Sequence, residues 1–186
     1  LLGRPQKPLD RISMASLIKN KKVLITGSGG SIGCELVRQI CDLRPAEVTL
    51  LDSSEYNLYS IDMEISVSHP DIVRRAIIID VRDRQAIYRV FNDVNPELVF
   101  HAAALKHVPL VEANPCEGVL TNVVGTTNIA DACVKTRVST MVMISTDKAV
   151  NPTNIMGASK RIAELYCQAL DVQRGANAGT RFVTVR

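Results

Sequence analysis

A regular alternation of short apolar runs with segments of helical spacing limits the fold more than any other feature of this chain. The runs are continuous β-branched or aliphatic stretches, which is typical of parallel strands covered on both faces. The segments between them repeat apolar residues at helical spacing, as Ile32, Leu36 and Ile40 do. Each connection is therefore predicted to be a helix. Strands are predicted at 22–26, 48–51, 76–79, 98–100, 141–144 and 182–185.

Strand and helix alternation with right-handed crossovers predicts an α/β fold with a doubly wound parallel sheet, in strand order 3-2-1-4-5-6. In such sheets ligands bind beyond the carboxyl ends of the strands. One longer helix is predicted from Val119 to about Val134. With 186 residues and 46% hydrophobic side chains, there is room for one domain core.

Composition excludes several classes of protein. No run of about 18 apolar residues and no secretory signal is present, so the chain as given is expected to be cytoplasmic. A net charge of +3, no Trp and 4% aromatic residues argue against a nucleic-acid partner. The five cysteines form no C-x-x-C pair and are expected to be free thiols.

The stretch T-G-S-G-G-S-I-G follows the first predicted strand and opens the first helix. Gly27 permits a tight turn, Gly30 lets backbone N–H groups approach a pyrophosphate, and Gly33 lets the helix pack on the sheet. This context predicts an NAD(P)-binding Rossmann domain over 22–186, after a basic lead segment at 1–21. The other contacts predicted for the cofactor in this loop are Ser28, Ser31 and Ile32.

Carboxylates end the second and third predicted strands. Asp52 can accept both hydroxyls of an adenosine ribose, and its charge would repel a 2′-phosphate. NAD is therefore favoured over NADP, since the three following residues supply no cation. Asp80 can accept from the adenine amino group while Val81 packs on the ring; alternatively, Asp80 caps the helix that begins near Asp83.

Further motifs carry a family resemblance. Together with the glycine loop and Asp52, they are similar to the extended short-chain dehydrogenase/reductase superfamily, and within it to the bacterial polysaccharide-biosynthesis nucleotide-sugar 4,6-dehydratases. The lead L-L-G-R-P also resembles the linker that follows the N-terminal membrane helices of the long members. The motifs are D-V-R-D at 80–83, H-A-A-A-L-K-H-V-P at 101–109, T-N-V-V-G-T at 121–126 and S-T-D-K-A-V-N-P-T-N-I-M-G-A-S-K-R at 145–161.

The resemblance implies an NAD-dependent dehydratase that acts on UDP-N-acetylglucosamine or a related UDP-N-acetylhexosamine, for capsule or O-antigen synthesis. Hydride leaves C4 of the sugar, a base removes the C5 proton as the C6 hydroxyl departs, and hydride returns to C6, without a metal. A homo-oligomer is also expected, because helices of this sheet type often pair between subunits. The chain is expected to be a fragment of a longer protein, anchored upstream at the cytoplasmic face of the inner membrane, whose substrate-binding part lies mostly beyond residue 186. The fragment alone is expected to lack activity.

The resemblance assigns the elimination to neighbouring residues after the fifth strand. Asp147 is the acid toward the C6 oxygen, and Lys148 is the base at C5. Thr146 or Ser145 is a candidate to orient the C4 hydroxyl. Lys148 can be a base only if desolvation or a nearby cation such as Lys160 lowers its pKa. An ordinary surface ion pair is the competing interpretation.

The superfamily places Tyr four residues before its catalytic Lys, which here is Lys160, expected to hold the nicotinamide ribose. Met156 stands at that position and cannot be an acid or base. Members of the long subgroup carry Met here, so the departure fits a subgroup. The group that takes the C4 hydroxyl proton stays open between Lys160, Lys148 and water. Met156 and Lys160 could instead be a buried and a snorkelling residue of one helix.

The fourth strand leads into small residues that let backbone approach the cofactor, namely Ala102, Ala103 and Ala104. His101 is expected to be a structural hydrogen-bonding residue. By resemblance, Lys106 and His107 are candidates for the sugar or its diphosphate, although a solvated loop is an alternative. Asn122 is a candidate near the substrate, or else satisfies backbone or packs in its helix.

Two other functions compete. A nucleotide-sugar 4-epimerase returns hydride to C4 and needs no acid at C6, so the pair Asp147 and Lys148 argues against it. A non-catalytic NAD-binding module is favoured only by Met156. The exact sugar and the stereochemistry at C5 are not decided by the order of residues.

Overall fold

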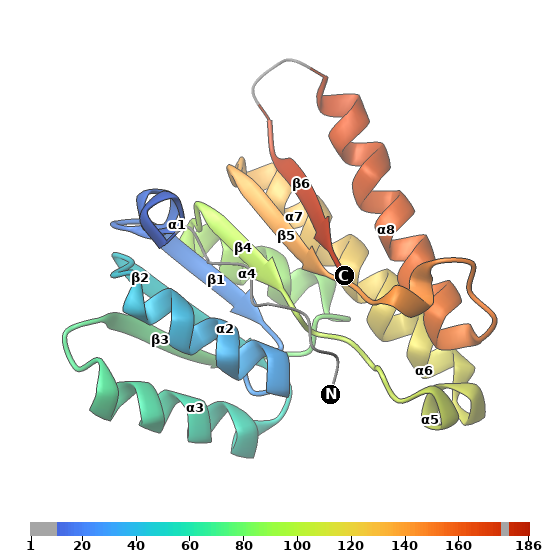
Figure 1. The fold of residues 1–186 in the computed structure, drawn as a ribbon, viewed down its shortest axis with the longest axis horizontal. Helices are drawn as coiled ribbons and strands as arrows, with labels where there is room; N and C mark the ends of the chain where they lie inside the picture. The colour runs from blue at the N-terminus through green and yellow to red at the C-terminus, as the bar shows by residue number, and fades with distance from the viewer. Residues whose placement is uncertain (1–10, 176–178) are drawn as a thin grey trace, which may run out of the picture.

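The structure, a computed structural model, describes residues 11–175 and 179–186. Its centre is a six-stranded parallel sheet in the order β3-β2-β1-β4-β5-β6 (Figure 1). The predicted fold class and strand order are therefore confirmed. The strands are β1 (Lys22–Thr26), β2 (Glu47–Asp52), β3 (Val73–Ile78), β4 (Leu98–His101), β5 (Thr140–Ile144) and β6 (Arg181–Val185).

Helices cover both faces of the sheet and enclose two cores. One core joins α1, α2 and α3 to the strands, and the other joins α4, α7 and α8 to the opposite face (Figure 1). The sheet residues that feed these cores, such as Leu24 and Ile25, are fully buried. The helices are α1 (Arg11–Ile18), α2 (Ser31–Asp42), α3 (Glu55–Ser68), α4 (Arg84–Val94), α5 (Val108–Ala113), α6 (Pro115–Val119), α7 (Thr126–Thr136) and α8 (Ile155–Arg174).

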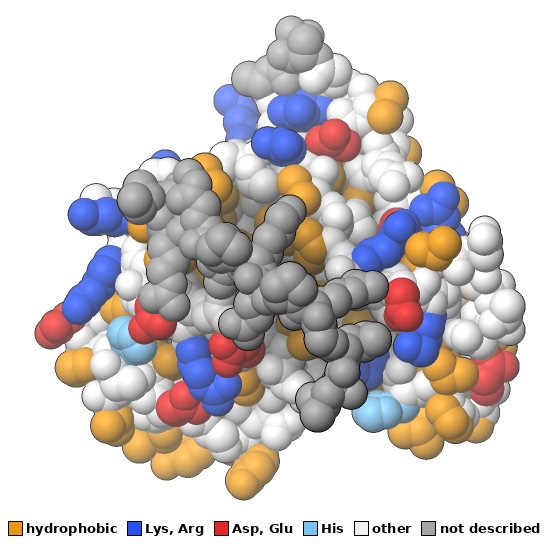
Figure 2. All heavy atoms as spheres, viewed as in Figure 1, with side chains coloured by type: hydrophobic (Ala, Val, Ile, Leu, Met, Phe, Trp, Pro, Cys, Tyr) orange, Lys and Arg blue, Asp and Glu red, His pale blue; other side chains and the backbone are white. Residues whose placement is uncertain are grey.

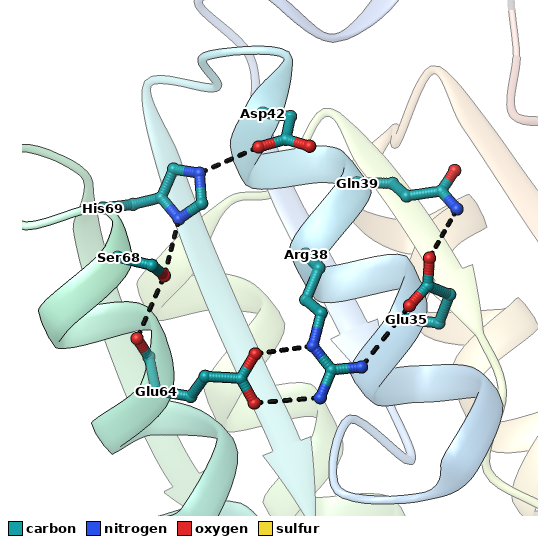
Figure 3. A network of polar contacts seen from close by, with 7 residues as sticks. All are labelled: Glu35, Arg38, Gln39, Asp42, Glu64, Ser68 and His69. Carbon is teal, nitrogen blue, oxygen red and sulfur yellow. Dashed lines mark hydrogen bonds and ion pairs between the residues drawn. The ribbon is translucent and has the colours of Figure 1, made fainter.

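Polar contacts tie α2 to α3 on one face (Figure 3). The Arg38 guanidinium donates two hydrogen bonds to the Glu64 carboxylate, the second at 2.9 Å. At the other end, His69 Nε2 lies 3.0 Å from Asp42 Oδ1. Because these groups are largely exposed, such pairs contribute about 0 to 1 kcal/mol each, and the apolar core holds the two helices.

The parallel register brings the predicted motifs to one edge. Thr26, the last residue of β1, pairs with Leu51 on one side and His101 on the other. The glycine loop, Asp52 and the segment after His101 therefore emerge next to one another. This edge is where the predicted ligand site must lie.

Two elements differ from the sequence-based expectation. The strand predicted at 76–79 begins at Val73 and lies at the sheet edge, where Arg74 and Arg75 reach carboxylates beside it. Such charged residues are tolerated because only one neighbour pairs with an edge strand. The helix predicted from 119 to 134 is α6 and α7, joined by the π-helical turn η1 (Leu120–Gly125).

The predicted lead segment is not wholly separate from the domain. Its last part forms α1, and Ile18 at the end of that helix is buried in the core with α2 and α3. Residues 1–10 of the lead lie outside the described residues. All five cysteines are free, as predicted.

The face shown in Figure 2 mixes basic and acidic side chains. Hydrophobic side chains gather at its lower left, where α3 lies in Figure 1. Four exposed residues of α3 contribute a stripe at helical spacing: Tyr56, Tyr59, Met63 and Val67.

Candidate active site

The glycine loop between β1 and α2 is held by close backbone packing. Gly27 has a φ of +66°, and a Cβ there would lie 2.6 Å from the Ala103 nitrogen. A Cβ on Gly33 would lie 1.9 Å from the Gly27 oxygen, whereas one on Gly30 would meet that oxygen at 3.3 Å. The loop therefore needs glycine at 27 and 33 for its own fold, while Gly30 keeps the surface open.

A first cleft of about 330 Å³ lies at the carboxyl edge of β1, β2 and β3. Its walls come from four separate connections of the sheet. It brings together most of the residues predicted to contact the cofactor: Gly27, Gly30, Asp52, Asp80, Val81, Ala102, Ala103 and Ala104.

The carboxylate of Asp52 is fixed by backbone. Its Oδ2 accepts from the N–H of Gly29 at 2.8 Å, and its Oδ1 accepts from the N–H of Ser54 at 2.9 Å. Each oxygen keeps a lone pair for another donor. The Asp52 carboxylate, which the sequence analysis assigned to a ribose, therefore lies in the wall of the cleft with a fixed orientation.

One cation also lines this cleft. The guanidinium of Arg82 donates to Asp80 Oδ2 at 2.7 Å and to Glu117 Oε2 at 2.6 Å. The hydrogen bond from Arg82 lowers the pKa of Asp80, which stays ionised. Asp83 caps α4 by accepting from the N–H of Ala86 at 2.9 Å, so the helix cap is not Asp80.

A second cleft of about 320 Å³ adjoins the first and shares Ala102, Ala104 and Leu105 with it. It lies at the end of β5 and against the start of α8. It brings together Ile32, predicted to contact the cofactor, and residues predicted for catalysis or substrate binding, namely Lys106, Thr146, Lys148, Met156 and Lys160. Asp147, the predicted acid, is not among the residues that line it.

Lys160 stands at the base of the second cleft. Its side chain is buried, and Nζ donates to the carbonyl of Ile144 at 2.7 Å. Burial lowers the pKa of Lys160 to about 8. Met156 lies one turn earlier on α8 and is also buried. The amine is thus still mainly charged at neutral pH, but its neutral form is far more accessible than that of an ordinary lysine.

Asp147 and Lys148 form the short 3₁₀ turn η2 (Asp147–Ala149), which Thr146 caps. Lys148 Nζ lies 3.5 Å from Asp147 Oδ1, and the side chains are 52% and 87% exposed. A hydrogen bond from Thr146 and the charge of Lys148 lower the pKa of Asp147. The desolvation expected for Lys148 is absent in this state because its side chain is half exposed.

His101 is a structural residue, as sequence reasoning expected. It is fully buried, with Nδ1 2.7 Å from Thr26 Oγ1 and Nε2 2.9 Å from Thr126 Oγ1. Burial, aided by the charge of Lys160, lowers the pKa of His101 to about 3. The ring is neutral and ties β1 to α7.

Some predicted residues lie away from the cleft surfaces. Asn122, a candidate for the substrate, is fully buried in η1, where its amide bonds Leu105 N–H and C=O and the hydroxyl of Ser159. That prediction is corrected to its alternative, a residue that satisfies backbone. Ser28 is buried and donates to Leu51 O, so its side chain cannot reach a cofactor.

Ser31 opens α2 with an exposed side chain, and His107 is the exposed residue before α5. Neither is among the residues lining the two clefts.

Sequence reasoning missed four residues around the clefts. Arg82 and Glu117 are far apart in sequence and meet only through the fold. Gly29 is as confined as the predicted glycines, since a Cβ would lie 2.5 Å from that of Asn57. The run of glycines in the sequence could have indicated Gly29. No nearby sequence pattern indicates Glu164, a buried carboxylate of α8 beside the end of β5.

Comparison with known proteins matches residues 23–186 to a family described as polysaccharide biosynthesis protein. The chain belongs to this family. The capsular polysaccharide biosynthesis protein CapD of Staphylococcus aureus is 45% identical across 100% of this chain and 31% of its own length. An inverting UDP-N-acetylglucosamine 4,6-dehydratase of Campylobacter jejuni is 34% identical across 91% of this chain and 49% of its own length.

Epimerases also appear among the relatives of this polysaccharide-biosynthesis chain. A UDP-glucose 4-epimerase of Rickettsia canadensis is 35% identical over 89% of the chain and 48% of its own length. The chain thus spans about a third to a half of these relatives. Two of these relatives are named for reactions on nucleotide sugars, a 4,6-dehydration and a 4-epimerisation, and identity alone does not separate the two reactions.

Solved structures give the same result for the fold. Pen from Bacillus thuringiensis has a TM-score of 0.82 and 34% identity, covering 91% of this chain and 52% of its own. DesIV from Streptomyces venezuelae, a dTDP-glucose 4,6-dehydratase with NAD bound, has a TM-score of 0.72 and 26% identity, covering 88% and 55%. In the described part of this chain, no helix combines the length and apolarity needed to span a bilayer.

Proposed function

We propose that this chain is the cofactor-binding and catalytic part of an NAD-dependent nucleotide-sugar 4,6-dehydratase acting on UDP-N-acetylglucosamine or a related UDP-N-acetylhexosamine. One observation carries the proposal most directly: the second cleft brings together the buried amine of Lys160 and the half-exposed amine of Lys148. The exposed Asp147 directly precedes Lys148 in the turn after β5 and lies outside the residues that line the cleft. The similarity to the Campylobacter dehydratase supports it.

The residues of the first cleft fit NAD. The glycine turn is packed so closely on Ala103 that a side chain at Gly27 is excluded, and this leaves backbone facing the cleft. Asp52 offers a fixed carboxylate for ribose hydroxyls and opposes a 2′-phosphate. Arg82, the one cation lining this cleft among the described residues, is already paired with two carboxylates. When bound, NAD supplies a reversible hydride acceptor.

The side chains of the second cleft divide the proton transfers. Lys160, whose pKa is lowered to about 8, can take a proton from the C4 hydroxyl in place of the missing Tyr, since its neutral form is accessible at neutral pH. Lys148 lines the same cleft and is assigned as the base for C5, a role that requires the bound sugar to desolvate its half-exposed side chain. Met156, buried one turn before Lys160 on α8, lines the same cleft and transfers no proton.

Asp147 is proposed as the acid at C6. Its pKa is lowered in the open site, so it is a carboxylate until substrate covers it. A bound sugar would displace water from this exposed group, and desolvation raises the pKa of a carboxyl. The acid is then formed only in the occupied site.

Several properties of the whole protein follow as proposals. We propose that it is a homo-oligomer and that a membrane anchor precedes this chain, placing the enzyme at the cytoplasmic face of the membrane. One relative, from Methanocaldococcus jannaschii, is named an uncharacterized membrane protein and is 40% identical over 93% of this chain. We further propose that the uridine is held by residues outside residues 22–186, so that this part alone lacks turnover.

The test is to incubate the whole protein with UDP-N-acetylglucosamine in D₂O. We expect a 4-keto product that absorbs in alkali, carries deuterium at C5 and forms without net NADH. Asp147→Asn and Lys148→Gln are expected to lower kcat by about 10²-fold or more, as loss of a general acid or base does. Lys19→Gln, an exposed change remote from both clefts, is the matched control.

A product epimeric at C4 that keeps its C5 hydrogen would replace the dehydratase with an epimerase. Tight NADH binding without turnover on either path would instead favour the non-catalytic module.

A further inference from the structure

The end of β5 is held by α8 through two neighbouring side chains. Lys160 Nζ donates to the carbonyl of Ile144, the last residue of the strand, at 2.7 Å. One turn further along α8, Glu164 Oε1 accepts from the hydroxyl of Ser145 at 2.6 Å. The N–H of Ser145 donates to Val185 O of β6 at 2.7 Å. Ser145 is therefore a fixed point directly before the turn that carries Asp147 and Lys148.

Glu164 is fully buried, yet it is well paired. Arg186 donates to both of its oxygens, from Nε at 3.0 Å and Nη2 at 2.7 Å, and Arg161 donates at 3.1 Å. These hydrogen bonds lower the pKa of Glu164 to about 2, so the group is a carboxylate throughout the neutral range. A buried charge costs several kcal/mol unless it is paired in this way. The fold thus keeps an ionised acceptor aimed at Ser145.

The turn after Ser145 is held by local hydrogen bonds and by packing on α8, and its last residue, Ala149, is buried. Its hydrogen bonds are local: Thr146 caps it, and the N–H groups of Lys148 and Val150 bond to Asp147. Asp147 is 87% exposed. A Cβ on Gly157 would lie 2.2 Å from the carbonyl of Lys148, which shows that the turn rests directly on the start of α8. The position of this turn therefore depends on the position of Ser145, which precedes it.

We propose that Glu164 is a positioning residue, held by Arg186, which through Ser145 fixes the segment 145–148 against α8. The expected effect of Glu164 on catalysis rests on the proposed function. Its role in fixing the segment 145–148 does not. Glu164 lies outside the residues lining the second cleft, so it acts on the substrate only through that segment.

The first measurement is hydrogen exchange followed by mass spectrometry on the whole protein, because it does not depend on turnover. Ser145→Ala and Glu164→Gln are expected to speed exchange at residues 148–150 by roughly tenfold or more, as loss of a hydrogen bond to a charged group implies. Exchange in α7 is expected to stay unchanged. Ser145→Thr, which keeps a hydroxyl, is expected to restore protection.

The second measurement is kinetic. Both variants are expected to lower kcat by about 10²-fold at nearly constant KM, because misplacement by about 1 Å costs that much. The double variant Ser145→Ala with Glu164→Gln is expected to be no slower than the slower single variant, since both remove one contact. Arg161→Gln is the matched control, because Arg161 donates a single hydrogen bond to Oε2 of the same carboxylate, whereas Ser145 donates to Oε1.

Unchanged exchange at 148–150 in both variants would overturn the inference, and so would faster exchange throughout the chain, which means a general loss of stability. Additive losses of kcat, or an Arg161→Gln effect as large as that of Glu164→Gln, would also overturn it. If the wild type shows no turnover, the proposed dehydratase fails, while the exchange result still decides the role of Glu164.

Discussion

The substitution Gly33→Ala tests the role of the glycine loop in packing, separately from its proposed role in cofactor binding. The new Cβ would stand 1.9 Å from the carbonyl oxygen of Gly27 and 2.7 Å from its carbon. Real contacts of this kind begin at 3.0 Å, so backbone of α2 or of the loop must move by about 1.1 Å. Both neighbours are main chain, and no flexible side chain can turn aside.

Overpacking of this kind costs about 1 to 3 kcal/mol and sometimes more. Because the obstacle is backbone, we expect Gly33→Ala to lower the free energy of unfolding by about 3 kcal/mol. For a domain of this size, that corresponds to a Tm lower by about 6 to 12 °C. Urea unfolding followed by circular dichroism, with a thermal melt, measures both values.

Gly30→Ala is the matched comparison. Its Cβ would meet the Gly27 oxygen at 3.3 Å, a tight contact that a shift of a few tenths of an ångström relieves. We expect a loss of stability below about 1 kcal/mol. NADH affinity, followed by fluorescence, is nevertheless expected to fall strongly, because a methyl group then faces the proposed pyrophosphate. Equal urea midpoints for Gly33→Ala and wild type, or a larger stability loss in Gly30→Ala, would refute this reasoning.

Three further predictions use single residues of the site. Asp52→Asn keeps an acceptor but removes the charge, so NADH should bind about tenfold more weakly and discrimination against NADPH should narrow in fluorescence titrations. Asn122→Ala leaves Leu105 N–H and C=O without their buried partner, so urea unfolding should show a loss of about 2 kcal/mol, against less than about 0.5 kcal/mol for exposed Asn92→Ala. His101 has a pKa of about 3 in the folded chain against an ordinary value of 6.5, so the unfolded chain binds more protons between these values. The free energy of unfolding should therefore fall as pH drops below 6.5, and His101→Gln should flatten this slope in urea midpoints measured from pH 4 to 7; an unchanged slope would contradict the assignment.

The strands and their order were predictable because the signals are local and strong. A buried parallel strand such as β1 is a continuous apolar run, and the right-handed crossover leaves few topologies for such an alternation. The glycine spacing identified the loop for the same reason. The edge strand β3 was placed less well, since Arg74 and Arg75 interrupt its apolar pattern and are accommodated only by neighbours that the fold supplies.

Contacts between distant residues could not be predicted from spacing. Glu164 reads as one more polar residue of an amphipathic helix, and only the register of β6 brings Arg186 to it. Asn122 was assigned near the substrate because its motif borders the site, yet the turn η1 directs its amide inward to Leu105. A π-helical turn shifts which residues face inward, and the helical spacing of apolar residues in this segment does not reveal the shift.

The two clefts differ in the charge of their lining residues, and on the proposed function this difference favours one orientation of the bound dinucleotide. The first is lined by Asp52, Asp80 and Glu117 against the single cation Arg82, whereas lysines 106, 148 and 160 line the second, which has no acidic residue among its described lining. On the proposed function, ribose hydroxyls and the adenine amino group are donors that suit the acidic end. The lysine end suits the anionic sugar diphosphate and the developing oxyanion at C4. A dinucleotide bound in the reverse direction would set its adenosine donors against three amines, so the charge pattern also selects the orientation that brings the nicotinamide to Lys160.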